Sequence, residues 1–520
     1  MKKINLILTA LFPSILFGQA TDVTHYEVHL QVSDSNNVIH VQELITVQFS
    51  GESNQLVLNL DDSDGETGMF VTSVKQDGQS VPYKHKAEQL MIRPSQASKG
   101  KQSTFEIFFK GVPKDGLVIG QNKFGDRTFF GDNWPNRAHL WFACVDHPSD
   151  KATVRFEVKA PSQYTCVAVG QLEKQESAEG YTTTTYFSQH PLPTKVMVIG
   201  LAKLVSEKLE IADGVPVENF VYPQDRQAGF HDMKVAVQPL EFFSNYISAY
   251  PFEKLYNVES TTRFGGMENA GCIFYDEGAV KGEGTMENLI AHEIAHQWFG
   301  NSASESDWPH IWLSEGFATY FTSLYLEHTY GKKRMQEQLK LDRARVLLFA
   351  QKVKTPVLDT ISNDLMNLLN PNSYQKGSWI LHMLRTKIGD DNFQRGIQTY
   401  YLKFAYKNAS TADFITCMNE ASGQDLTSFF DQWLKRSGHP IFKIEKVKKG
   451  KYEMLRILQM QEIPFEFQLE IDMDYPSGKE RVFVEGNQRE TIVPITIGQK
   501  VTTWEVDPDV KLLFELYSQE

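Results

Sequence analysis

The segment "TMENLIAHEIAHQWF", Thr285–Phe299, carries apolar residues at helical spacing and is followed by Gly300, where we expect the helix to end. His292 and His296 lie four residues apart in it, so both imidazoles share one helix face, one turn apart. Two nitrogens placed in this way can bind one Zn²⁺, and Glu293 beside them is suited to act as general base for a metal-activated water. The alternative is an amphipathic helix in which these side chains are incidental.

Glu315 in "WLSEGFATYF" is the best candidate for a third metal ligand. It begins the next helical pattern, nineteen positions after His296. A catalytic zinc site needs three protein ligands and an open fourth position. An acidic residue in the first turn of a helix can also be present only because the helix dipole favours it. These residues alone leave both interpretations open.

Upstream, "RFGGMENAGCIFYDE", Arg263–Glu277, is an extended apolar segment that Gly265, Gly266 and Glu268 interrupt. Glycine weakens a strand, so it usually marks a place where a ligand or another backbone approaches closely. We therefore expect a second backbone or a ligand beside this segment.

The whole chain has 520 residues, of which 41% are hydrophobic and 22% charged, as in ordinary soluble globular proteins. This length suggests about three domains. The formal net charge of −13 argues against a general nucleic-acid-binding protein, which would normally have a basic face.

The chain changes its pattern twice. Strand-like alternation over residues 21–205 gives way to mostly helical patterns over residues 206–440, and alternation returns over residues 441–520. Within the helical part, Ser410 or the next residue is expected to cap a helix that Gly423 ends. We therefore expect a multidomain α+β protein, with an N-terminal antiparallel β domain, a mostly helical middle domain and a smaller C-terminal β domain.

The first twenty residues, "MKKINLILTALFPSILFGQA", have the features of a secretory signal. Lys2 and Lys3 form a basic start, and an apolar run follows from Ile4 to Phe17. That run is shorter than the ~20 residues that a membrane span needs. We expect residues 1–20 to be a signal peptide, the protein to be exported to the periplasm or secreted, and no transmembrane anchor to follow. The alternative is a buried N-terminal helix.

The four cysteines are Cys144, Cys166, Cys272 and Cys417. Their spacing fits neither a small disulfide scaffold nor a CxxC metal site. We expect small buried thiols. A bridge between Cys144 and Cys166 in an oxidising compartment is the alternative.

Three motifs together resemble the aminopeptidase N family of zinc metallopeptidases, which includes the leukotriene A hydrolases. "HEIAHQWFGN" followed by "WPHIWLSEGFATYF" resembles the family's zinc segment, "GGMENAG" its GxMEN motif and "SYQKGSWIL" its Tyr-x-Lys-Gly segment. Weaker similarity extends through "HYEVHLQV", "CVDHPSDKATVRFEV" and "DLTSFFDQWLKRSGHP", so the resemblance covers nearly all of the chain after residue 20. It implies a thermolysin-like catalytic domain over residues 206–440 and a β-sandwich over residues 441–520.

The resemblance also implies a role for each candidate residue. One Zn²⁺ would be bound by His292, His296 and Glu315, and Glu293 would take a proton from water and pass it to the leaving amine. Tyr374 in "YQKG" would donate a hydrogen bond to the oxyanion that forms in the reaction. Without the motif around it, Tyr374 would be read as a packing residue.

The GxMEN motif would bind substrate. The residues concerned are Gly265, Gly266, Met267, Glu268 and Asn269, with the glycines contacting the peptide backbone at the edge of a small sheet. Glu268 would pair with the protonated α-amine and hold the first peptide bond at the metal. The implied function is a zinc aminopeptidase that acts on peptides with a free N-terminus. For Glu268, the alternatives are a structural ion pair and a solvated strand residue. For the function, they are a zinc endopeptidase and a non-catalytic peptide-binding protein.

Two features depart from the family. Members commonly have a Gln or Glu ahead of the Cys-x-Asp-x-Pro region that helps to hold the substrate amine, but that position falls on Trp134 here. Asn133 could substitute, or Trp134 could shape the pocket for the first side chain. The chain also stops after its small β domain, where many members continue with a large helical domain. A more open cleft is therefore expected, which another subunit could complete, and an epoxide-hydrolase role is disfavoured.

Overall fold

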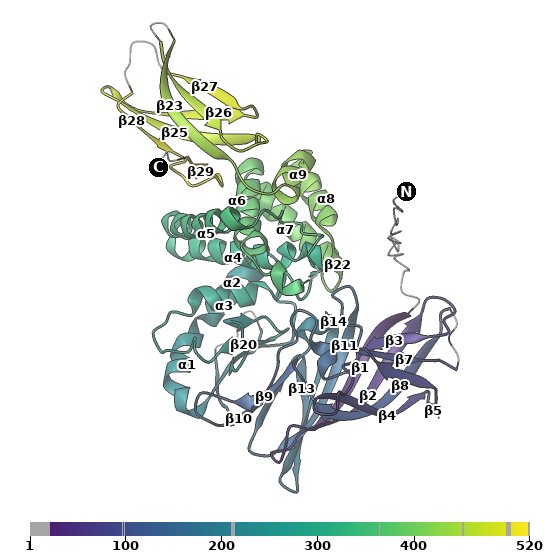
Figure 1. Ribbon diagram of the computed structural model, residues 1–520. Coiled ribbons are helices and arrows are strands. Elements are labelled where there is room, and N and C mark those ends of the chain that lie inside the picture. The colour runs from purple at the N-terminus through teal and green to yellow at the C-terminus, as the bar shows by residue number, and fades with distance from the viewer. Residues whose placement is uncertain are drawn as a thin grey trace, which may run out of the picture.

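The computed structural model describes residues 21–517 apart from residues 96, 98, 210–213, 363, 450, 451 and 496–500. The expected signal peptide, residues 1–20, therefore lies outside the described residues. Figure 1 shows a β-rich N-terminal part, a largely helical middle part and a β-rich C-terminal part, with the helices between the other two. The expected multidomain α+β fold is confirmed.

The N-terminal part is built on a sheet of eight strands, in which six of the seven strand pairings are antiparallel. Within β2 alternate residues point into the core, as the sequence pattern predicts. Only β1 and β11 run parallel to each other. In spatial order the strands are β13 (Gln171–Ala178), β14 (Tyr181–Pro193), β11 (Lys151–Pro161), β1 (Thr21–Gln31), β2 (Ile39–Phe49), β8 (Gln102–Val112), β4 (Gly68–Gln76) and β5 (Gln79–Ser80).

Two smaller sheets complete this part, and the core of the domain is packed with apolar side chains from all three sheets. One sheet contains β12 (Thr165–Ala168), β15 (Ile199–Ala202), β10 (Arg127–Gly131) and β9 (Leu117–Gln121); the other contains β3 (Leu56–Asn59), β7 (Gln89–Ile92) and β6 (Tyr83–Lys86). The short helices η1 (Ala138–Leu140) and η2 (Thr194–Val196) connect these strands. All four cysteines of the chain are buried free thiols.

The middle part begins with a sheet that the helical patterns do not predict. Its order is β16 (Val205–Lys208), β17 (Val217–Val221), β18 (Leu255–Ser260), β20 (Cys272–Asp276) and β19 (Gly266–Met267). Strands β17, β18 and β20 run parallel, and β19 is an antiparallel edge strand. Parallel strands are buried on both faces, so they lack the alternation by which half-buried strands are recognised.

Nine α-helices in the described part of the chain pack on this sheet and on one another. They are α1 (Arg226–Met233), α2 (Val237–Tyr246), α3 (Glu287–Ala295), α4 (Trp312–Tyr330), α5 (Lys332–Lys352), α6 (Gly377–Ile388), α7 (Asp390–Phe404), α8 (Thr411–Ser422) and α9 (Thr427–Lys435). Shorter elements are η3 (Pro223–Asp225), η4 (Lys234–Ala236), η5 (Trp308–His310), η6 (Leu365–Leu368), the π-helical turn η7 (Asn372–Lys376), β21 (Ser304–Glu305) and β22 (Asn408–Ala409). Over the described residues, no helix combines the length and the hydropathy that crossing a bilayer requires.

The C-terminal part consists of two sheets. One contains β27 (Glu490–Pro494), β24 (Tyr452–Gln459), β23 (Ile441–Lys449) and β29 (Glu515–Leu516); the other contains β26 (Gly478–Gly486), β25 (Phe467–Tyr475) and β28 (Thr503–Val506). Phe442 on β23 and Phe467 on β25 pack with their ring centroids 4.7 Å apart, so the two sheets share one apolar core.

Buried lysines join the N-terminal part to the middle part. Lys195 of η2 forms an ion pair with Glu305 of β21, with 2.5 Å between Nζ and Oε1 and both side chains almost fully buried. Lys151 of β11 donates from Nζ to the carbonyl oxygens of Ser302, at 2.7 Å, and Lys407, at 3.1 Å. These contacts fix one part against the other close to the end of α3.

Candidate active site

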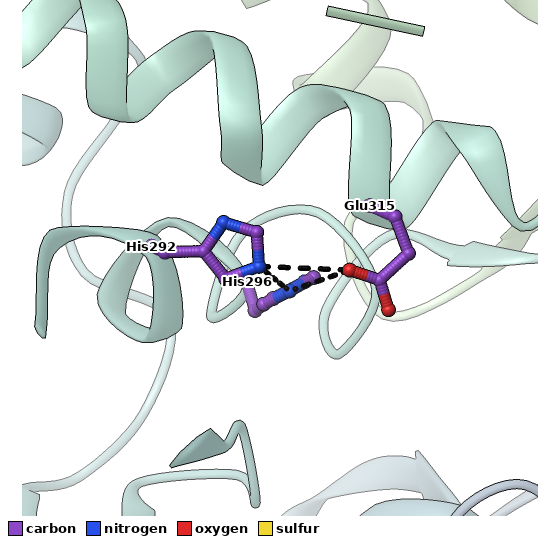
Figure 2. A group of neighbouring side chains, drawn as sticks. All are labelled: His292, His296 and Glu315. Carbon is purple, nitrogen blue, oxygen red and sulfur yellow. Dashed lines mark hydrogen bonds and ion pairs between the residues drawn. The ribbon is translucent and has the colours of Figure 1, made fainter. Parts of the chain in front are cut away.

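The three predicted metal ligands converge at the ends of α3 and α4. Nε2 of His292 lies 3.1 Å from Nε2 of His296, and Oε2 of Glu315 lies 3.6 Å from the first nitrogen and 3.3 Å from the second. Figure 2 shows the three side chains pointing toward one another. The spacing of four residues along one helix aligns the two histidines, and the packing of α4 beside α3 adds Glu315.

Helix α3 ends earlier than predicted. Its last residue is Ala295, and His296 caps it, whereas Gly300 lies in the turn that follows, with φ of +113°. The helix tightens there, because the amide of Gln297 donates to the carbonyl of Ile294, only three residues back. The tightened turn still leaves His296 on the same face as the other histidine.

The contacts around His296 set its orientation. Nδ1 of His296 lies 3.1 Å from the carbonyl oxygen of Phe299 and 3.0 Å from Oγ of Ser314. Donation from Nδ1 to that carbonyl leaves the lone pair on Nε2, which faces His292 and Glu315. This is the arrangement that a metal-binding histidine requires.

The donor set fits Zn²⁺. Two imidazole nitrogens and one carboxylate are a ligand set of catalytic zinc sites. Oε2 of Glu315 is buried without a hydrogen-bond partner and faces both nitrogens. Burial alone would raise the pKa of Glu315, but the two histidines outweigh it and hold that pKa well below its usual range. A negatively charged oxygen is thus available to a cation at this point.

Glu293 lies beside the metal ligands and against Gly266. A Cβ built on Gly266 would lie 2.3 Å from Oε1 of Glu293, so only glycine leaves room for this carboxylate. Burial raises the pKa of Glu293 well above its usual value, and the carboxylates of Glu268 and Glu315 add to the effect while His296 opposes it. The prediction assigned Gly266 to substrate; the structure adds the contact with Glu293.

Strand β19 offers a free edge beside this carboxylate. Gly266 and Met267 pair with Tyr275 and Phe274 of β20 on one side, and β19 is the last strand of its sheet on the other. Gly265 precedes the strand and is exposed. An extended peptide could add to such an edge through backbone hydrogen bonds.

Glu268 is held by its backbone while part of its carboxylate stays without a partner. Its carbonyl oxygen accepts hydrogen bonds from Nε2 of Gln297, at 2.9 Å, and from Nδ2 of Asn301, at 2.6 Å. The side chain is only 5% exposed, burial raises its pKa, and Oε1 has no hydrogen-bond partner. Ligand atoms of Glu268, Glu293 and His296 all lie within 4.8 Å of one another. Among the residues that the structure describes, Glu268 is therefore neither a solvated strand residue nor one half of a structural ion pair.

Gln297 and Asn301 are site residues that the sequence reasoning missed. Gln297 also donates from Nε2 to the carbonyl oxygen of Glu293, at 3.1 Å, and accepts from the amide of Gly271, at 2.8 Å. It thus ties the zinc-binding helix to the loop that carries Glu268. Their place directly after His296 in "HQWFGN" was the available signal.

Asn269 lies outside the cavity at this site, although it was predicted to bind substrate. The residue is fully buried, and its side-chain amide has no hydrogen-bond partner. Its backbone shapes the loop: the amide donates to Met267 and the carbonyl accepts from Cys272.

Tyr374 approaches the metal ligands from η7. Its ring is stacked on His292, with centroids 6.0 Å apart and planes 10° from parallel. Burial, followed by the charge of Glu315, raises the pKa of Tyr374 well above its usual value, so the hydroxyl keeps its proton. A Cβ on Gly316 would lie 2.9 Å from Cα of Gly377, so this glycine pair lets α4 pack closely on the start of α6, directly after η7.

These groups share one cavity of about 50 Å³. Trp134 reaches it from the N-terminal part and is 2% exposed. Asn133 cannot take its place, because its amide donates to the carbonyls of Thr194 and Met197 and accepts from Trp141. The residues that line the cavity are Trp134, Phe264, Gly266, Met267, Glu268, His292, Glu293, His296, Glu315, Leu369 and Tyr374.

Two segments of the chain match one peptidase family. Residues 22–194 match the "Peptidase M1 N-terminal domain" and residues 231–433 match the "Peptidase family M1 domain". Together these segments cover most of the described chain, including every metal-ligand candidate and Trp134.

Similar proteins are found in distant organisms. Glutamyl aminopeptidase of Homo sapiens is 29% identical over 333 residues, which cover 61% of this chain and 35% of that protein. A protein named probable aminopeptidase 2, of Sulfurisphaera tokodaii, is 24% identical over 504 residues, or 92% of this chain and 59% of its own length. The chain thus spans about a third of the human relative, at 35%. The crystal structure of an M1 zinc metallopeptidase from Deinococcus radiodurans has a TM-score of 0.70 at 23% identity, covering 81% of this chain and 95% of that one.

Proposed function

Because the chain belongs to peptidase family M1, we propose that it is a zinc aminopeptidase that hydrolyses the N-terminal bond of peptides with a free α-amine. One observation carries the choice of reaction. Glu268 presents a buried carboxylate oxygen without a partner in the same cavity as the candidate zinc ligands. Such an oxygen would accept its strongest hydrogen bond from a positively charged donor such as a protonated amine.

His292, His296 and Glu315 would hold the metal. A bound Zn²⁺ would act as a Lewis acid, lowering the pKa of water to near ~7 and polarising a carbonyl group. Glu293 lies in the same cavity as these ligands, where a general base must be within reach of the attacking water. Its carboxylate would accept a proton from the attacking water and deliver that proton to the leaving amine.

The remaining residues would position the peptide. A substrate strand would pair with the free edge at Gly266 and Met267, while Glu268 binds the α-amine. With the amine held there, the first peptide bond is the one that reaches Glu293. Tyr374 would donate a hydrogen bond to the carbonyl oxygen as that oxygen gains charge, which is typically worth roughly 10²–10³ in rate.

A comparison of two substrates tests this proposal. The purified protein with zinc is given a short peptide and its N-acetylated twin, and initial rates are measured with and without a chelator. We expect cleavage of the free-amine peptide alone, with release of its first residue. Equal cleavage of both peptides would indicate an endopeptidase. Binding of the peptide without turnover would indicate a peptide-binding protein.

We also propose that the protein is exported and that its domains meet near residues 205 and 440. The basic and apolar character of residues 1–20 supports export. Sequencing the N-terminus of the protein recovered from outside the cytoplasm tests this: a start close to residue 21 is expected, and a cytoplasmic protein that keeps Met1 would contradict it.

A further inference from the structure

One side of the cavity is apolar. We call this group of residues the apolar wall: Trp134, Phe264, Met267 and Leu369. Its members come from separate places in the fold. Trp134 follows β10, Phe264 and Met267 belong to the segment around β19, and Leu369 follows η6. Segments far apart in the sequence thus converge on one apolar surface beside Glu268.

Aromatic contacts hold the wall in place. The ring of Trp134 meets the ring of Phe264 edge to face, with centroids 6.3 Å apart, and that of Trp308 in the same manner at 6.1 Å. Such contacts favour one orientation of the indole. The wall is therefore a preformed surface, which keeps the entropic cost of binding an apolar group low.

The two arginines behind the wall already form ion pairs with carboxylates. Nε of Arg137 donates to the carbonyl oxygen of Trp134 at 2.7 Å, and its two terminal nitrogens lie 2.7 Å from Asp115 and 2.6 Å from Asp132. Arg263, beside Phe264, also pairs with Asp115 at 2.7 Å. Both guanidinium groups are thus engaged with carboxylates, and one of them anchors the wall.

The charges that face the cavity are unfavourable to an acidic ligand. Three of the lining residues, Glu268, Glu293 and Glu315, are carboxylates. The only nitrogen bases among the described lining residues are His292 and His296, which are the candidate metal ligands. The side chain of an acidic first residue would add a fourth carboxylate to the cavity and would find no lysine or arginine among the described lining residues, and burying an unpaired charge is costly.

We propose that the apolar wall binds the side chain of the substrate's first residue, so that the enzyme selects uncharged apolar first residues and rejects aspartate and glutamate. This inference rests on the proposed aminopeptidase function. An amine on Glu268 places the first side chain next to the wall, because Met267, the neighbour of Glu268, belongs to the wall. Trp134 then acts as a specificity residue, which agrees with its inability to accept a hydrogen bond from an amine.

The test is a panel of aminoacyl substrates with one common leaving group. The zinc-loaded protein is assayed for kcat/KM on the alanyl, leucyl, methionyl, glutamyl and aspartyl compounds. We expect leucine and methionine to exceed glutamate by at least about a hundredfold. Equal rates on leucine and glutamate would overturn this inference but leave the aminopeptidase function intact. Hydrolysis of none of the compounds, with a free-amine peptide also left intact, would instead remove the proposed function.

Substitutions in the apolar wall test whether the wall determines the preference for the first residue. Trp134→Ala should lower the ratio of leucyl to alanyl kcat/KM by about tenfold, because a leucine side chain loses its contact surface and an alanine side chain loses little. Trp134→Phe should retain most of the ratio, since an aromatic surface remains. An unchanged ratio in Trp134→Ala would overturn the assignment.

A second substitution covers the case in which Trp134→Ala does not fold. Leu369→Ala removes another member of the wall and should lower the same ratio. Leu348→Ala is its matched control, because Leu348 lies on α5, is 62% exposed and is not part of the cavity. Equal ratios in these two variants would count against the wall.

Discussion

The carboxylate of Glu293 lies so close to Gly266 that a methyl group on that glycine would stand 2.3 Å from Oε1 and 2.7 Å from Cγ. A glycine of the strand proposed to bind substrate therefore also limits the position of the proposed general base. This contact would link the placement of the peptide to the placement of the proton acceptor.

Gly266→Ala should lower kcat by about a hundredfold or more, because displacing a catalytic group by about 1 Å has an effect of this size. Zinc content, measured on the same sample, should stay at one per chain. Gly120→Ala on β9 is the matched control: a Cβ there has no atom within 4 Å, and Gly120 does not line the cavity. If the two alanine variants have the same kcat, the contact with Glu293 does not govern activity.

Glu268→Gln should weaken the preference for a free amine. The substitution keeps the shape of the side chain but removes its charge, and a buried charge pair broken in this way typically costs about 2–5 kcal/mol. The ratio of kcat/KM between a free-amine peptide and its N-acetylated twin should fall by at least about tenfold, mainly through KM. An unaltered ratio would assign amine recognition to another group.

Glu293→Ala should retain zinc and lose turnover, with kcat lower by about a thousandfold. His296→Ala should lose the metal itself, and a chelator should reproduce that effect on the unaltered protein. Metal content and melting temperature, measured with and without added Zn²⁺, separate these outcomes, because a ligand that binds only the folded state stabilises it. Full activity of Glu293→Ala would exclude it as the base.

Tyr374→Phe should lower kcat by roughly 10²–10³ while changing KM little, as expected for a donor that acts on the transition state. Tyr330→Phe is a suitable control, since Tyr330 is 54% exposed and lies outside the cavity. A rise in KM at constant kcat would assign Tyr374 to substrate binding instead.

Asp342 on α5 predicts a pH dependence of stability. Its side chain is fully buried, Oδ2 has no hydrogen-bond partner, and burial raises the pKa from 3.8 to about 6. The folded state thus favours the protonated form. The contribution of Asp342 to the free energy of unfolding is therefore complete below pH 3.8 and is lost as pH rises through about 6.

Asp342→Asn removes this titration and keeps the shape of the side chain. Relative to the unaltered protein, the variant should gain stability between pH 4 and pH 7, by up to about 3 kcal/mol from (6 − 3.8) × 1.36. Denaturant unfolding at both pH values measures the difference. A constant difference between the two proteins would show that Asp342 does not titrate in this range.

Local patterns predicted much of the fold and the metal cluster. His292 and His296 converge because four residues make one helical turn, which the sequence displays directly. Ser410 caps α8 through a capping box with Asp413, and Gly423 ends that helix in the left-handed conformation, as expected. These features depend on neighbours in the chain, so residue types and spacing suffice to predict them.

Features that depend on packing escaped prediction. The buried parallel strands β17 and β18 show no alternation, and the contact between Gly266 and Glu293 joins residues 27 positions apart. The position of Trp134 and Asn133 ahead of the Cys-x-Asp-x-Pro region identified both as candidate substrate-binding residues. Only the tertiary contacts of Asn133 with Thr194, Met197 and Trp141 show which of the two remains free to line the cavity.

The buried pair of Lys195 and Glu305 has a consequence for any exchange of one part of the chain. Each charge lies in one domain and is neutralised by the other, and removing one partner of a buried pair typically costs about 3–5 kcal/mol. Exchange of either part for an unrelated sequence would leave one of these two charges unpaired in the interface, so the exchanged chain is expected to be less stable.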